Sequence, residues 1–221
     1  MNVYISIGAQ CTTATLFDRL HVKKETLPFD WIVSTPEFVY TILNLLLIDE
    51  KEISDIVDNH FFVCDKTATF LEVEHFVLNE NGAVLVNSKY NVCFPHDTID
   101  DRDKYIRRME RLKKIILDKD NFIHFVYVSV SSPTDGNYTL DGIEPIKNIY
   151  EYIEKINSII KKIRSNYRIF VFDTNKPSDC QPSDDLHIKY YDINKRKIWT
   201  ELMPELCCIC NDLIDTVECL N

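Results

Sequence analysis

Cys11 stands where a thiol can act as a nucleophile. Residues 3–7 are β-branched or aromatic and predict a strand that ends at Gly8, and residues 12–20 carry apolar side chains at helical intervals. Cys11 therefore lies between a strand and the start of a helix, where free backbone N–H groups and the helix dipole favour a thiolate. The alternative is a small buried thiol that packs where the strand meets the helix.

His96 is the candidate partner of this thiol. It lies between Pro95 and Asp97, where an extended segment leads into a helix. An imidazole within reach of Cys11 would accept the thiol proton, as in other cysteine–histidine pairs. The alternative is a structural or exposed histidine. Asp97 would point elsewhere on an extended backbone, which leaves three other acids as candidates for the third member of a triad: Asp30, Asp173 and Asp192.

Basic residues gather on the helix that follows His96: Arg107, Arg108, Arg111, Lys113 and Lys114. An arginine fork in this place would suit a carboxylate or phosphate substrate. The alternative is a solvated helix face whose cations pair with Asp103, Glu110 and nearby acids. We favour the solvated face for all of these residues except Arg108.

Four cysteines near the C-terminus raise the question of a zinc site: Cys207, Cys208, Cys210 and Cys219. They lack the paired two-residue spacing of common zinc sites, and apolar residues over 198–217 predict a packed helix. We therefore expect core cysteines and no metal site. The chain also has no Walker loop and no Gly-rich dinucleotide motif, so we expect no cofactor.

Strands and helices alternate along the chain. Strands are predicted over 3–7, 122–130, 168–172 and 187–191, and helices over 12–20, 34–48, 100–117, 143–164 and 198–217. Residues 70–78 and 83–87 flank a turn at 79–82 and predict a hairpin. This pattern indicates an α/β fold with a mainly parallel sheet, flanking helices and an inserted β-hairpin. The alternative is an α+β papain-like fold.

Composition limits the function classes. The 221 residues carry a formal net charge of -10 without a long basic stripe, so we expect no nucleic-acid partner. No signal peptide or apolar run of about 20 residues is present, so we expect no membrane partner, a cytoplasmic location and reduced thiols. We expect a single domain over 1–221, with the motifs in about 1–130 and a strand and helix part over about 131–221.

Four sequence blocks resemble the putative papain-like cysteine peptidase family, a domain of unknown function in bacteria and large DNA viruses, including poxviruses. The blocks are SIGAQC at 6–11, LPFDWI at 27–32, FPHD at 94–97 and YIRRMERL at 105–112. The resemblance implies that Cys11 is the nucleophile and His96 its partner, and it indicates a poxvirus-type member of the family. The supporting residues expected are Gly8, Gln10, Asp30, Trp31, Asp97 and Arg108.

Two features depart from papain. Papain-like enzymes place an oxyanion glutamine some residues before the cysteine, whereas Gln10 is directly adjacent to Cys11. The strand and helix alternation also looks more like a flavodoxin-like or SGNH-hydrolase-like sheet.

Two functions follow from the sequence. The first is a thiol-dependent hydrolase or acyl-transfer enzyme that acts on a peptide or an ester, with N–H groups near 8–13 holding the oxyanion. The second is a noncatalytic viral interaction protein that binds a host or viral protein. In the viral case we expect it in the host cytoplasm.

Overall fold

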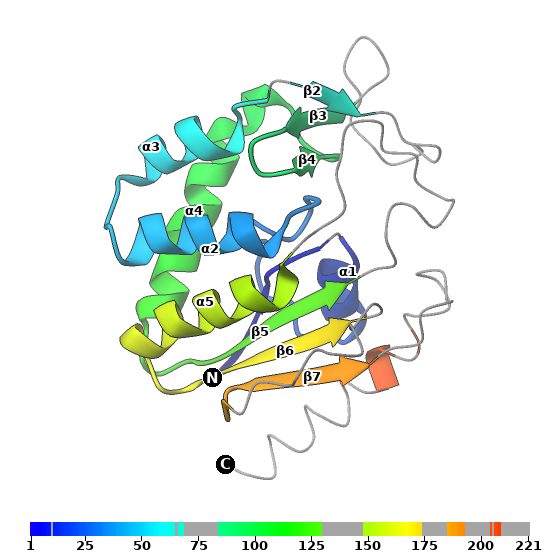
Figure 1. Cartoon of the computed structure of the whole chain (residues 1–221), viewed down its shortest axis with the longest axis vertical. Helices are drawn as coiled ribbons and strands as arrows, with labels where there is room; N and C mark the ends of the chain where they lie inside the picture. The colour runs from blue at the N-terminus through cyan, green and yellow to red at the C-terminus, as the bar shows by residue number, and fades with distance from the viewer. Residues whose placement is uncertain are drawn as a thin grey trace.

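A parallel sheet forms the centre of the protein (Figure 1). The computed structural model describes residues 1–9, 11–64, 66–68, 84–129, 148–173, 185–192, 204 and 206–208. Its main sheet has the strand order β1 (Asn2–Ser6), β5 (Phe122–Ser129), β6 (Tyr167–Asp173) and β7 (Ile188–Asp192). All three pairings in this sheet are parallel, which confirms the predicted α/β class.

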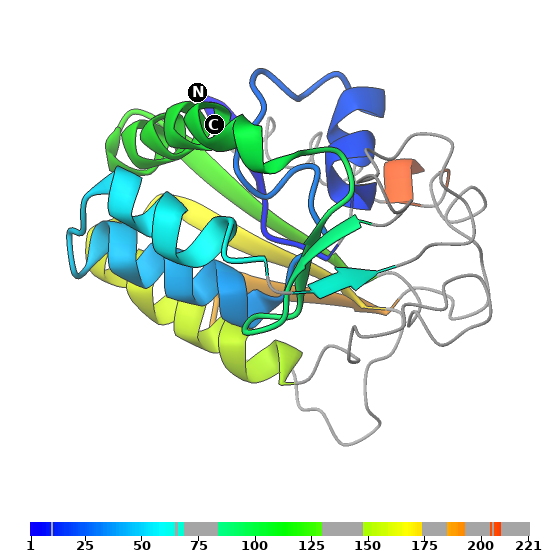
Figure 2. The same ribbon diagram turned by 90° about the horizontal axis from the view of Figure 1, so that it is seen from above.

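Helices cover both faces of this sheet (Figure 2). The buried sides of α2 (Pro36–Leu47), α4 (Arg102–Leu117) and α5 (Ile149–Ile163) join one core with the inward side chains of the strands. Helix α1 (Thr12–Arg19) covers the opposite face, where Phe17 belongs to a second core. Because successive side chains along a strand point to opposite faces, the same strands contribute side chains to both cores.

Helix α2 begins where its sequence predicts. Thr35 is the N-cap residue, and its Oγ1 accepts a hydrogen bond of 3.1 Å from the Phe38 N–H. Pro36 follows at the first helical position, where its missing N–H costs no hydrogen bond. The Thr35 hydroxyl also donates to the Tyr90 carbonyl oxygen at 3.2 Å, so the start of the helix is tied to a distant loop.

A small antiparallel sheet lies between α2 and α4 in the chain. Its strands are β2 (Lys66–Ala68), β3 (Val84–Asn87) and β4 (Val92–Phe94), with β3 in the middle. Strand β3 confirms the second half of the predicted hairpin. The predicted strand at 70–78 and its turn at 79–82 lie outside the described residues.

Not all of the helical segments were predicted from the sequence. Helix α3 (Ile53–Ile56) continues directly into the π-helical turn η1 (Val57–Phe61), neither of which was predicted. The short 3-10 helix η2 (Ile99–Asp101) leads into α4, as the acidic start at 100 indicated. Of the predicted helix over 198–217, the described residues 204 and 206–208 are helical.

Two isolated bridges join the two sheets. Ala9, just beyond β1, donates its N–H to the Val128 carbonyl oxygen at 3.2 Å and accepts from the Ser34 N–H at 3.0 Å. Val33 in turn pairs with Cys93 of β4 through two backbone hydrogen bonds of 3.0 Å. The segment at 33–34 therefore fixes the end of β1 beside β4.

No helix in the described part of the chain is both long and apolar enough to cross a membrane.

Candidate functional site

Cys11 and His96 meet at the junction of the two sheets. The distance from Cys11 Sγ to His96 Nε2 is 3.3 Å, although 85 positions separate the residues in sequence. Cys11 follows Ala9 by two residues and is the N-cap residue of α1, while His96 follows Cys93 by three. The two bridges that join the sheets therefore bring the two side chains together.

Gly8 shapes the turn that presents Cys11. Its φ of +129° is one that residues with a side chain rarely adopt, and an added Cβ would lie 3.1 Å from the Tyr127 ring. The Thr13 hydroxyl donates a 2.8 Å hydrogen bond to the Gly8 carbonyl oxygen, which ties the first turn of α1 to this backbone. A glycine is therefore needed here for both conformation and space.

Trp31 packs against the catalytic candidate His96. The two ring centroids are 5.8 Å apart with an interplanar angle of 85°, an edge-to-face arrangement. The Lys23 ammonium lies over the Trp31 ring, 4.3 Å from its centroid. Lys23 was missed by the sequence analysis, because nothing local distinguishes it from its neighbour Lys24.

Asp30 holds Lys23 in this position. Its Oδ2 lies 3.6 Å from Lys23 Nζ and accepts a 2.9 Å hydrogen bond from the Leu27 N–H. Asp30 is only 2% exposed, and this burial raises the pKa of its carboxyl group. Lys23 acts against that rise, so the two residues form a nearly buried ion pair beside Trp31.

Asp97 contacts three side chains of α4. The Tyr105 hydroxyl donates a 2.6 Å hydrogen bond to Asp97 Oδ2, and Lys104 Nζ donates to Oδ1. Arg108 NH1 lies 3.9 Å from the same carboxylate, and its guanidinium stacks on the Tyr105 ring. Asp97 and Arg108 thus belong to a buried polar network beside the site.

Burial disfavours the charged form of the Cys11 thiol. Loss of hydration raises the pKa of the Cys11 thiol to about 11, and the charges of Asp97 and Asp30 act in the same direction. The backbone N–H of Cys11 and the Lys23 ammonium lower the pKa, but by less. Burial therefore opposes the resting thiolate that the position at the helix start would favour.

Some predicted site residues cannot be placed. Gln10 and the side chains of Asp173 and Asp192 lie outside the described residues. Cys207 is partly buried against the second core and Cys208 is exposed, while Cys210 and Cys219 lie outside the described part. Among the residues that the structure describes, no group of three or more His, Cys, Asp or Glu side chains could hold a metal ion.

Comparison with known proteins identifies the family. The chain is 24% identical over 226 residues to the uncharacterized protein R408 of Acanthamoeba polyphaga mimivirus, covering 87% of this chain and 98% of that protein. No solved structure matches the chain significantly. The family model described as "Putative papain-like cysteine peptidase" matches residues 2–139, which include Cys11 and His96. The chain therefore belongs to the putative papain-like cysteine peptidase family.

Proposed function

We propose that this protein is a thiol-dependent hydrolase or acyl-transfer enzyme in which Cys11 is the nucleophile and His96 the general base. The observation that carries the proposal is the 3.3 Å separation of Cys11 Sγ and His96 Nε2. This distance lies within the reach of a hydrogen bond to sulfur, as proton transfer between the two groups requires. Membership of the family supports the same class of chemistry.

The first step begins from a neutral pair, because burial raises the pKa of Cys11 to about 11. As Sγ attacks the carbonyl carbon of a peptide or an ester, the thiol proton passes to Nε2 of His96. Collapse of the tetrahedral intermediate breaks the bond to the leaving amine or alcohol, which takes that proton from the imidazolium. Water or another nucleophile then attacks the thioester and frees Cys11.

The start of α1 supports the charge that develops on the carbonyl oxygen. Thr12, Thr13 and Ala14 open this helix, and the first N–H groups of a helix have no intrahelical partner. Cys11 immediately precedes them, so an oxygen on the attacked carbon would lie near these donors. Backbone N–H groups so arranged stabilise an oxyanion without having to move.

Acetylation of Cys11 tests this chemistry without knowledge of the substrate. We expect p-nitrophenyl acetate to release p-nitrophenol in a burst and to leave one acetyl group on Cys11, detected by peptide mass spectrometry. His96→Ala should slow the burst by about 100-fold or more, since a positioned general base contributes on that scale. Cys208, which is exposed, is the internal control for unassisted acetylation.

Two outcomes would contradict the proposed enzyme function. If Cys11 were acetylated no faster than Cys208, or at the same rate in His96→Ala, the pair would not act as nucleophile and base. The second candidate function would then stand: a noncatalytic protein that binds a host or viral protein in the host cytoplasm. The raised pKa of Cys11 favours this candidate, because a resting thiol is a weak nucleophile.

A further inference from the structure

A second concave site lies at the other end of β1. Cys11 follows the C-terminal end of this strand, whereas a cavity of about 420 Å³ is lined by residues at its N-terminal end. Val3, Val22, Leu27 and Ile115 give the cavity apolar walls. A volume of this size falls in the range of small-molecule sites.

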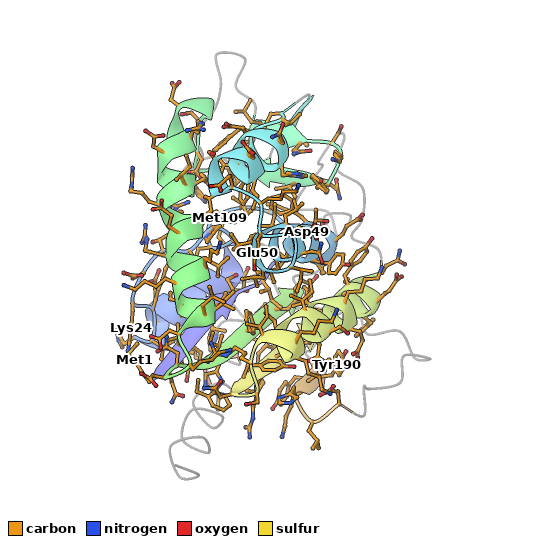
Figure 3. The ribbon with its side chains drawn as sticks, turned by 90° about the vertical axis from the view of Figure 1, so that its left-hand side faces the viewer. Met1, Lys24, Asp49, Glu50, Met109 and Tyr190 are labelled. Atoms are coloured by element: carbon orange, nitrogen blue, oxygen red, sulfur yellow. The ribbon has the colours of Figure 1, made fainter. Side chains whose placement is uncertain are left out.

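Three cations line the same cavity: Lys24, Arg111 and Lys114. Lys24 lies in the segment that follows α1, and the other two lie on the second half of α4. Figure 3 shows Lys24 next to Met1 at the end of α4. Cations from two separate elements therefore converge on one apolar cavity.

These cations are not neutralised by the protein in its described part. None of the three has a carboxylate oxygen within 4.0 Å among the residues that the structure describes. Arg111 Nε donates to the Arg107 carbonyl oxygen at 3.2 Å, which fixes its side chain along the helix. Asp103, one of the expected partners of the basic cluster, lies 3.4 Å from Arg102 instead.

The two acidic residues that line the cavity do not pair with these cations. Asp118 accepts hydrogen bonds from the Asp120 N–H at 3.0 Å and from the Asn121 amide at 3.2 Å. Glu25 also lines the cavity, but it is exposed and makes no ion pair among the described residues. The cavity is thus lined by three cationic side chains and two carboxylates, and one of the carboxylates belongs to Asp118, the C-cap residue of α4.

We infer that this cavity binds a small organic anion, with an apolar body against Val3, Leu27 and Ile115 and a carboxylate, phosphate or sulfonate head among the three cations. Apolar walls with a few converging polar groups are the usual composition of such sites. Arg111 supplies a planar fork for an oxyanion, and the two lysines supply point charges. The site is separate from the Cys11 and His96 pair.

Two fluorescent probes that differ in one charge test the inference. We expect 8-anilinonaphthalene-1-sulfonate to bind the full chain at one site, more tightly than N-phenyl-1-naphthylamine, which lacks the sulfonate. Arg111→Met and Lys114→Met should each weaken the sulfonate probe about tenfold and leave the neutral probe within twofold. Lys113→Met is the matched control, because Lys113 lies on the same helix but does not line the cavity.

Several outcomes would overturn the inference. They are an equal affinity for the two probes, an equal loss in Lys113→Met, or no saturable binding of the sulfonate. Lys114→Met replaces an exposed side chain and should keep the fold, so its result stands even if Arg111→Met unfolds the protein. The Cys11→Ala variant should bind the probe normally, which separates this test from that of the catalytic pair.

Discussion

Lys23 is expected to control the reactivity of Cys11. Its ammonium lowers the pKa of the thiol and also neutralises Asp30, whose charge raises that pKa. In Lys23→Met both effects push the pKa of Cys11 upward, so the thiolate fraction at a fixed pH falls. We predict that iodoacetamide alkylates Cys11 about three- to tenfold more slowly at pH 8, measured by mass spectrometry.

Lys24→Met is the matched control for this prediction. Lys24 is the next residue in the chain, but it is exposed and lines the anion cavity instead. Its variant should alkylate at the wild-type rate and weaken the sulfonate probe, the reverse of what we expect for Lys23→Met. Equal alkylation rates in the two variants would show that Lys23 does not act on the thiol.

The sequence points to the proposed nucleophile and base more clearly than to the contacts that surround them. Cys11 and His96 stand out locally, because one follows a strand and a glycine and the other precedes a helix. Asp30 was an expected supporting residue, but its contact with Lys23 depends on the folded loop at 20–31, which no spacing rule describes. The raised pKa of the Cys11 thiol could not be predicted either, since burial is a property of the whole packed site.

At the scale of elements, Thr35 is expected to stabilise more than one helix end. Its Oγ1 accepts from the Phe38 N–H and its hydroxyl donates to the Tyr90 carbonyl oxygen. Thr35→Ala removes both bonds at a buried position, so we predict a loss of about 1–2 kcal/mol in the free energy of unfolding. Urea denaturation monitored by circular dichroism measures this change.

Thr41→Ala provides the comparison within the same helix. Thr41 is less buried, and its hydroxyl donates only to the Glu37 carbonyl oxygen one turn earlier at 2.9 Å. Alanine is the better helix former here, so we expect a change within about 0.5 kcal/mol. A similar loss in both variants would mean that the cap and the bond to Tyr90 contribute little.

The elements that the sequence predicted well share strong local signals. Helix α2 has a cap, a proline and a continuous apolar stripe, and β1 and β5 are rich in β-branched and aromatic residues. The π-helical turn η1 and strand β2 have no such signal and depend on their tertiary partners. The isolated bridges at 33–34, which bring Cys11 to His96, are tertiary contacts of the same kind.

At the scale of the whole molecule, the two ends of strand β1 in the main sheet border two different sites. The end of β1 carries the Cys11 and His96 pair beside the small sheet, and its beginning borders the cationic cavity. The net charge of -10 gave no hint of that cavity, because its cations come from two segments that only folding brings together. The fold class was predictable from alternation, but this pairing of distant segments was not.

His124 makes the stability of the whole molecule sensitive to acid. It is 1% exposed, and its ring is stacked between the rings of Tyr4 and Phe170. Its Nε2 lies 3.3 Å from Asn2 Oδ1. Burial, helped by the charge of Arg168, lowers the pKa of this imidazole to about 4. The unfolded chain therefore binds a proton near pH 6.5 that the folded protein accepts only near pH 4.

Stability should consequently fall as the pH drops through this window. The shift corresponds to about 3 kcal/mol, which the native state loses between pH 6.5 and pH 4 and keeps in full above pH 6.5. Between pH 6.5 and pH 4, the free energy of unfolding should fall by about 3 kcal/mol less in His124→Phe and His124→Gln than in the wild type. Urea denaturation at several pH values measures this difference. Because acids elsewhere titrate alike in all three proteins, parallel pH profiles for wild type and variants would contradict a buried neutral His124.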